Sequence, residues 1–213
     1  MKKEKILALT KEYVYNELAN DRTGHDWWHI ARVTKMAKNM AIEEKADTFI
    51  CEMSALLHDL ADEKLNVSEE AGLTKVSNWL VSVELDEKTK LEIIEIISTI
   101  SFKGGGQPKM KSLEGKIVQD ADRLDAIGAI GIARTFAYAG AKGDLIYDPA
   151  ILPRDSMTKK EYRTGKSTAI NHFYEKLLKL KNSMNTPIAK KMAEERHQRL
   201  ENYLDAFFEE WDI

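Results

Sequence analysis

The chain has 213 residues, of which 43% are hydrophobic and 31% are charged, and its formal net charge is −3. This balance is typical of a soluble globular protein and excludes the disordered and membrane classes. Because positive and negative charges nearly cancel, no global field attracts the protein to a nucleic-acid backbone or to an anionic membrane. We therefore expect neither as a partner, and we expect any phosphate group to be bound locally.

The N-terminal residues and the cysteine content indicate the compartment. Met1 is followed by a charged stretch, and the short apolar run after it soon meets Lys11 and Glu12, so neither a secretory signal nor a membrane span can be drawn there. We expect a cytoplasmic protein. Cys51 is the only cysteine. It excludes an internal disulfide and a multi-thiolate zinc site, and we expect it to be a core thiol.

Apolar residues recur at three- and four-residue intervals over most of the chain, which predicts an all-α fold without a convincing strand. Asp26, Asp47 and Thr186 are the expected N-cap residues, with Pro187 at the first position of the last helix. In chain order, the expected helices cover about 2–19, 26–44, a segment from 47 that runs into 58–59, 68–83, 86–100, 112–139, 166–181 and 186–211.

The interruptions of this pattern suggest how the domain is organised. Turn-forming residues fill 20–24, and three glycines and a proline make 103–108 a loop. The stretch 140–165 is long enough to be a functional loop or lid. We predict a single domain that spans the whole chain: a helical-bundle core of about 20–140, a lid-like loop at 140–165, and a C-terminal helical layer at 166–213. Gly128 and Gly131 lie inside the predicted 112–139 helix, where they suggest close approach of another helix.

Three of the five histidines fall in two short polar stretches, 25–29 and 58–59. His58 and Asp59 follow the apolar run 55–57 on a helix face that should be buried. Burial of a carboxylate costs several kcal/mol unless a cation or a paired hydrogen-bond donor compensates. We predict that a metal ion compensates. Imidazole nitrogen and carboxylate oxygen ligands suit Mn, Fe(II), Co, Ni, Zn or Mg, and suit Cu(I) or Ca poorly.

These residues resemble the HD-domain phosphohydrolase superfamily, and in particular its small stand-alone bacterial members. The superfamily pattern is a His, then a His-Asp doublet, then an Asp, each on a separate helix; here it is matched by His29, by His58-Asp59 and by Asp122 within the run Ala-Asp-Arg-Leu. Asp120 and Asp125 compete with Asp122, and the flanking residues favour Asp122. The resemblance implies a helical bundle that holds one divalent cation with His29, His58, Asp59 and Asp122.

Four such ligands would leave two octahedral positions, where a bound water could be activated for attack on a phosphoryl group. Asp62 and Glu63 follow the doublet by one helical turn, so one of them can serve as the general base. Their plainer alternative is a solvated helix end. Trp27 and Trp28 are expected to pack in the core and at its rim rather than to stack on a base.

Phosphate-binding roles are predicted for four further residues, which are His25, Lys103, His172 and Lys176. Each has a structural alternative. His25 can cap a turn, and Lys103 can lie on a plain surface loop. His172 and Lys176 can belong to a solvated charged face, and only the family resemblance favours a phosphate-binding role for them.

The resemblance implies hydrolysis of a phosphate ester or anhydride of a nucleotide, with pyrophosphohydrolysis of nucleoside or deoxynucleoside triphosphates favoured. A monophosphatase and a cyclic-nucleotide phosphodiesterase stay open. The rival from another class is a non-catalytic nucleotide-binding regulatory module that keeps the metal for structure. A di-iron oxygenase needs further ligands, and the sequence has no histidine between His58 and His172. The metal, the base preference and the oligomeric state, with a homodimer as one option, are left open.

Overall fold

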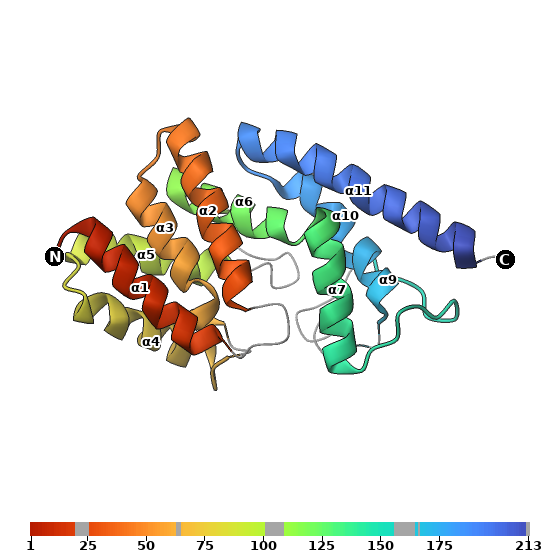
Figure 1. Cartoon of the computed structure of the whole chain (residues 1–213), viewed down its shortest axis with the longest axis horizontal. Coiled ribbons are helices and arrows are strands. Elements are labelled where there is room, and N and C mark those ends of the chain that lie inside the picture. Colours follow the sequence, from red (N-terminus) through yellow and green to blue (C-terminus); the bar gives the residue numbers. More distant parts are fainter. Residues whose placement is uncertain (20–25, 63–64, 101–108, 156–164, 166, 212–213) are drawn as a thin grey trace. The chain divides into compact units, whose positions relative to one another are not determined.

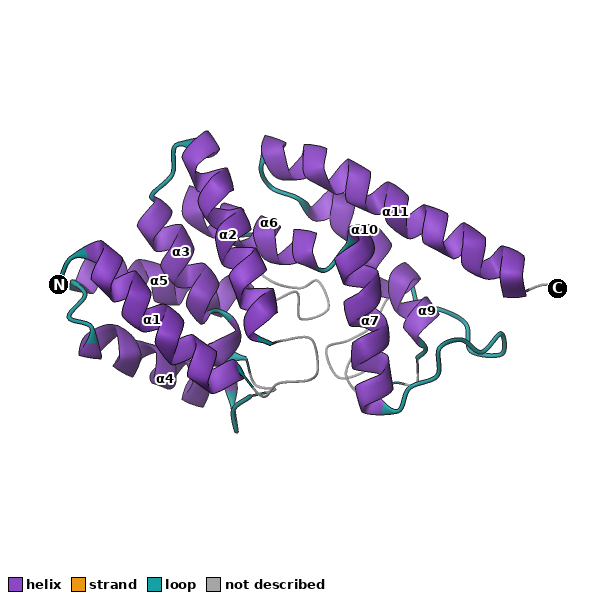
Figure 2. Cartoon of the chain, viewed as in Figure 1, coloured by secondary structure: helices purple, strands orange, loops and turns teal. Residues whose placement is uncertain are grey.

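The computed structural model describes residues 1–19, 26–62, 65–100, 109–155, 165 and 167–211 (Figure 1). Throughout these residues the chain forms helices and loops, and none of them forms a strand (Figure 2). The all-α prediction is therefore confirmed. Among the described helices, none combines the length and the apolar character that crossing a membrane requires.

The chain divides into two compact units. The first comprises 1–21, 25–102 and 106–122, and the second comprises 22–24, 103–105 and 123–213. All four predicted metal ligands belong to the first unit, whereas His172 and Lys176 belong to the second. The prediction of one domain over the whole chain stays a prediction.

Helix α3 is the centre of the first unit. It packs against α1, α2 and α5, and every residue from Phe49 to Leu57 is buried. The elements of this unit are α1 (Lys3–Leu18), α2 (Trp27–Glu44), α3 (Thr48–Leu57), the short 3-10 turn η1 (Asp59–Ala61), α4 (Glu69–Ser82), α5 (Glu87–Ile100) and the greater part of α6 (Leu113–Asp125). A helix buried on all sides is what a continuous apolar run predicts.

Side-chain caps fix where the central helices begin. The Asp26 carboxylate accepts a hydrogen bond from the His29 backbone N–H at 2.9 Å, and Asp47 accepts from the N–H groups of Phe49 and Ile50 at 2.8 and 3.2 Å. Such caps satisfy amide groups that the first helical turn leaves without a partner. Both predicted N-caps are therefore confirmed, and the first turns of α2 and α3 are fixed by them.

The single cysteine lies in the middle of α3. Cys51 is fully buried, and its Sγ lies 3.9 Å from the Glu114 carbonyl oxygen. Burial raises the pKa of this thiol far above its usual value, and the nearby carboxylates of Glu114 and Asp47 raise it further. The prediction of a core thiol is confirmed.

In the second unit, α7 (Gly128–Lys142) packs against the longest described helix, α11 (Pro187–Trp211). The shorter elements are α9 (Ala169–His172), the π-helical segment η2 (Phe173–Leu177), α10 (Leu178–Leu180) and the 3-10 turn η3 (Lys181–Ser183). Aromatic rings fill the space between the helices: Phe173 stacks on Tyr203 at 5.6 Å between ring centroids. The Thr186 hydroxyl accepts from the Ala189 N–H at 3.3 Å, which confirms the predicted cap of α11.

Two predicted helices differ from those observed. The single helix expected over 112–139 is two helices, α6 and α7, because the chain turns at Gly128, whose φ of +74° is unfavourable for residues with a side chain. The helix expected over 166–181 begins only at Ala169 and passes through the π-helical segment. Apolar periodicity predicted both segments as helical but carries no information on these local breaks.

Glu175, in the π-helical segment, is a buried charge that ties the loop before it to the helices. Its carboxylate accepts hydrogen bonds from the backbone N–H, Nε and Nη2 of Arg154, at 3.1, 2.8 and 2.8 Å, and from the Ser167 hydroxyl at 3.1 Å. Burial alone would raise the pKa of Glu175, but the hydrogen bonds and charge of Arg154 outweigh burial and hold the pKa below its usual value. The folded state therefore favours the ionised form of Glu175 over the protonated form.

Replacement of Glu175 by Gln should lower the free energy of unfolding by about 3 kcal/mol at pH 7, because the half-buried Arg154 loses its counter-ion. A carboxylate whose pKa is depressed on folding stabilises the protein above its unfolded pKa of about 4.3 and loses this effect as the pH falls through the folded value. The difference between the two proteins should therefore shrink between pH 7 and pH 3. Urea unfolding at both pH values measures it. Glu194→Gln, which removes an exposed partner of Lys181, is the control and should change stability by less than about 0.5 kcal/mol.

Candidate metal centre

Three helices and one turn of the first unit carry the candidate ligands. His29 lies in the first turn of α2, and His58 directly follows the last residue of α3. Asp59 begins η1, and Asp122 lies in the last turn of α6. Because the Asp26 carboxylate caps α2 at the His29 amide, the start of the helix fixes where the His29 side chain leaves the backbone.

The imidazole and carboxylate groups converge on one point. His29 Nε2 lies 3.4 Å from Asp59 Oδ2, and His58 Nε2 lies 3.2 Å from Asp59 Oδ1. Asp122 Oδ1 lies 3.5 Å from His29 Nε2 and 3.8 Å from His58 Nε2. Ligand atoms at about 2.1 Å from one ion lie roughly 3.0 to 3.5 Å apart, so these separations are close to those of a shared coordination sphere.

Burial distinguishes Asp122 from the other candidate ligands. His29, His58 and Asp59 are 1%, 6% and 7% exposed. Their ligand atoms all lie within 4.8 Å of one another, a group that can hold a metal ion. The Asp122 side chain is 33% exposed. The cluster is therefore enclosed on the side of α3 and η1 and reached by solvent on the side of Asp122.

His58 shows how the cluster fits a cation. Its Nδ1 lies 2.8 Å from the Ala55 carbonyl oxygen, which can only accept, so Nδ1 carries a proton and Nε2 is the nitrogen that a metal ion could bind after deprotonation. Within the described residues, this buried Nε2 has no hydrogen-bond partner. A buried ring nitrogen beside carboxylates, on an imidazole whose other nitrogen is held by a carbonyl, is the arrangement expected of a metal ligand. The residues present therefore fit a divalent cation.

Electrostatics point the same way. Burial lowers the pKa of His58, but the carboxylates of Asp59 and Asp122 outweigh burial and raise the pKa to about 10. The negative potential that favours a proton on the imidazole also favours a metal cation. The two compete for the same nitrogen, because a metal ligand must be deprotonated there.

The three aspartates of α6 have different surroundings. Asp120 is fully buried, and Asp125 pairs with Arg134 at 3.0 Å within the second unit. The Asp122 carboxylate lies beside His29 and His58. This geometry favours Asp122 over its neighbours, as the flanking sequence does.

The predicted catalytic and phosphate-binding residues are only partly described. Asp62 follows η1 directly, is half-buried, and donates its backbone N–H to the Asp59 carbonyl oxygen at 3.0 Å. His172 ends α9, and Lys176 lies in the π-helical segment; both are half-buried in the second unit. These roles stay predictions. The remaining three, His25, Glu63 and Lys103, lie outside the described residues.

The two neighbouring tryptophans differ from each other. Trp27 contacts Tyr15 edge to face, at 5.6 Å between ring centroids, as packing predicts. Trp28 is 67% exposed, so it does not pack into the core. In the first turn of a helix, adjacent residues point about 100° apart, and that rotation separates a packed side chain from an exposed one.

Sequence reasoning missed two residues that contact η1, the turn that begins with Asp59. Asn66 donates from Nδ2 to the Leu60 and Asp62 carbonyl oxygens, both at 2.8 Å, and so bridges η1 and the residue after it. Gly72, in α4, lies against Ala61. An asparagine in a turn is too common to single out. A glycine inside a helix is a usable signal, because it costs about 1 kcal/mol relative to alanine and often marks a close approach.

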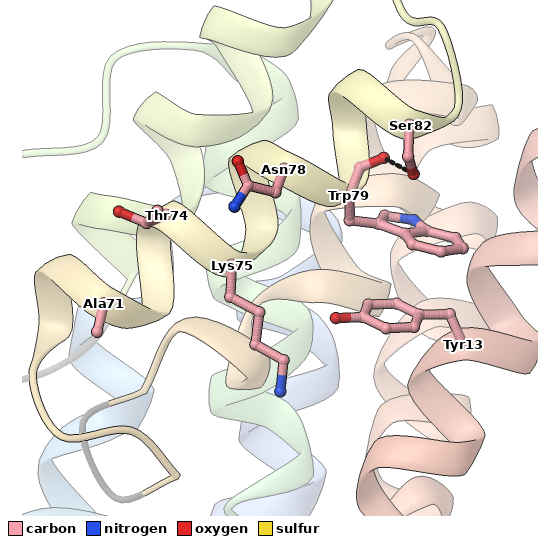
Figure 3. A pocket seen from close by; sticks show the side chains of 7 residues that line it. All are labelled: Tyr13, Ala71, Thr74, Lys75, Asn78, Trp79 and Ser82. Carbon is pink, nitrogen blue, oxygen red and sulfur yellow. Dashed lines mark hydrogen bonds between the residues drawn. The ribbon is translucent and has the colours of Figure 1, made fainter.

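The first unit also has a surface hollow of about 430 Å³ between α1 and α4 (Figure 3). Figure 3 shows the parallel rings of Tyr13 and Trp79 at one end and the Lys75 side chain extended beside them. None of the four candidate ligands lines it; the lining residues are Tyr13, Ala71, Thr74, Lys75, Asn78, Trp79 and Ser82. The hollow is therefore separate from the metal cluster.

The first unit is helical throughout its described residues and carries an ordered His, His-Asp, Asp set. Comparison with known proteins shows which family has this combination. The family model described as HD domain matches residues 27–127. The chain belongs to the HD domain family, and the predicted resemblance is confirmed.

Three solved structures are similar over nearly the whole chain. A Bacillus thuringiensis protein named as an HD-superfamily hydrolase is 49% identical, with 99% of both chains covered and a TM-score of 0.78. A Lactobacillus plantarum protein is 41% identical, with 98% of both chains covered and a TM-score of 0.90. Bacillus subtilis YpgQ, solved in complex with ADP, is 37% identical, with 96% of this chain and 97% of that chain covered and a TM-score of 0.77. The name of the Bacillus thuringiensis relative supports a hydrolase.

After treatment with a chelator, the protein should bind about one Mn²⁺ per chain. His29→Ala and His58→Ala should each weaken binding by more than about 100-fold, since loss of a ligand costs more than loss of a residue that only orients one. Isothermal titration calorimetry measures both stoichiometry and affinity. The matched control is His197→Gln: His197 lies on α11 beside Glu201, 3.3 Å away. Binding as tight in the His29 and His58 variants as in the control would contradict the assignment.

Proposed function

We propose that this protein is a metal-dependent phosphohydrolase that acts on nucleotides in the cytoplasm. The observation that carries the proposal is the convergence of His29, His58 and Asp59 in a buried cluster, with Asp122 Oδ1 within 3.8 Å of both imidazoles. These four residues would hold one divalent cation, chosen from Mn, Mg, Fe, Co, Ni and Zn by their nitrogen and oxygen ligand atoms. When bound, such an ion supplies a Lewis acid for a phosphoryl oxygen and lowers the pKa of water.

The chain's own residues would orient the ligands and move the proton. The Ala55 carbonyl holds the His58 ring in one tautomer, and the Asp26 cap holds the start of α2. Asp62 or Glu63 would accept the proton of the attacking water, because both follow Asp59 closely in the chain. The exposed side of the cluster, at Asp122, would be where a phosphate group enters.

The substrate class is supported by a relative. YpgQ was solved in complex with ADP, and this chain is 37% identical to it. We propose a nucleotide substrate, with pyrophosphohydrolysis of nucleoside or deoxynucleoside triphosphates as the favoured reaction. His25, Lys103, His172 and Lys176 would bind its phosphates. Phosphate groups carry a charge that a chain with a net charge of −3 must neutralise locally.

Asp59→Asn should abolish both metal retention and turnover, because the amide lacks the charge that offsets the cation. The measurement is a screen of phosphorylated nucleotides with Mn, Mg, Co and Ni, after metal analysis of the purified protein. Asp205→Asn, an exposed position on α11, is the matched control and should behave as wild type. Metal and nucleotide binding without turnover across the screen would favour the rival, a regulatory module with a structural metal. The burial of three ligands would also be compatible with this rival.

The general base can be identified by separating binding from turnover. If Asp62 is the base, Asp62→Asn should lower kcat by about 10²- to 10⁴-fold while the Mn²⁺ dissociation constant changes less than threefold. Glu63→Gln is the matched variant. The residue whose replacement lowers kcat in this way is assigned as the general base. Full activity in both variants would remove both from the proposed mechanism.

A further inference from the structure

Helix α4 and the turn η1 meet at a point where no side chain fits. A Cβ atom built on Gly72 would lie 2.5 Å from the Ala61 carbonyl oxygen and 2.8 Å from the Ala61 C and Cα atoms. All three are backbone atoms of η1, which begins with Asp59. Because ordinary contacts begin near 3.4 Å, any residue larger than glycine here must displace the backbone of α4 or of η1 by about 1 Å.

Helix α4 is held from the other side and resists displacement. Figure 3 shows the Trp79 ring stacked on Tyr13 of α1. Their centroids lie 4.0 Å apart, and Trp79 Nε1 donates to the Thr10 hydroxyl at 3.0 Å. Lys75 forms an ion pair with Glu17 of α1. Val76 is fully buried one turn after Gly72. The part of α4 from Lys75 to Trp79 is therefore held to α1 by side-chain contacts.

The turn η1 is the smaller partner; its three residues are buried, and it also contacts α3. It has three residues, and a 3-10 turn has poorer hydrogen-bond geometry than an α-helix. Besides its packing on α4, it is held by Asn66, whose side-chain amide donates to the carbonyl oxygens of Leu60 and Asp62. A collision at Gly72 should therefore displace η1, and Asp59 with it.

We propose that Gly72 and Asn66 are positioning residues that set the place of Asp59 in the metal cluster. The inference rests on the proposed function, since it requires Asp59 to bind a cation. Gly72 allows the close approach of α4, and Asn66 holds the turn in register. Sites of this kind tolerate errors of about 0.5 Å in ligand position, so a displacement of about 1 Å is large enough to weaken binding.

The test compares Mn²⁺ binding by Gly72→Ala, Asn66→Ala and the wild-type protein. Gly72→Ala should bind Mn²⁺ about 10- to 100-fold more weakly, the range found when support of a ligand is lost, while its far-ultraviolet circular dichroism stays helical. Asn66→Ala should change affinity in the same direction. The visible absorption of Co²⁺-loaded protein should also change in Gly72→Ala, because a displaced carboxylate alters the coordination geometry.

Two controls separate position from stability. Gly140→Ala makes the same substitution in α7, where an added Cβ meets nothing within 4 Å, and should leave Mn²⁺ binding unchanged. Ile6→Ala removes a buried side chain of α1 and should lower the melting temperature without changing Mn²⁺ affinity. If Mn²⁺ binding were weakened as much in Ile6→Ala as in Gly72→Ala, the inference would be overturned, because lower stability alone would then explain the loss of binding.

The outcomes distinguish this inference from the proposed function. Wild-type protein that binds no metal would overturn both. Wild-type protein that binds Mn²⁺, together with Gly72→Ala and Asn66→Ala variants within twofold of it, would overturn only the inference. If Gly72→Ala does not fold, Asn66→Ala decides, since its side chain makes hydrogen bonds and leaves no collision.

Discussion

The burial of one carboxylate between two imidazoles is the constraint on which the first unit depends. Asp59 is 7% exposed and lies within 3.4 Å of a nitrogen of both His29 and His58. A carboxylate taken out of water needs positive charge nearby. The raised pKa of His58 is one expression of this need, and the proposed affinity for a metal ion would be the other. The surrounding helices bring together groups that would otherwise stay in water.

The cluster is supported in two different ways. His29 and His58 are held locally, by a cap within four residues of His29 and by a carbonyl one turn before His58. Asp59 instead belongs to η1, whose backbone is contacted by residues further along the chain, namely the amide of Asn66 and the bare backbone of Gly72. A substitution far from the ligands in sequence can therefore disturb a carboxylate while leaving both histidines in place.

This difference also explains what the sequence could predict. Caps such as Asp26 and Thr186 depend on neighbours within three residues, so the residue types alone identified them. The ligand set was predicted from an ordered family pattern, and its four side chains lie together, although metal binding itself stays a proposal. The break at Gly128 and the contact of Gly72 with Ala61 depend on backbone angles and on packing between elements. In the sequence, each of these two features is marked only by a glycine. A glycine alone does not distinguish a turn from a close approach of two backbones.

The position of Cys51 has a practical consequence. Thiolate is the reactive form of cysteine, and a buried thiol surrounded by carboxylates resists ionisation, alkylation and oxidation. Folded copies of the chain should therefore not become cross-linked through it in air. A cysteine engineered at an exposed position would be the one thiol available to a fluorophore or spin label. Slow modification of Cys51 itself would report transient opening of α3, the helix that leads to His58.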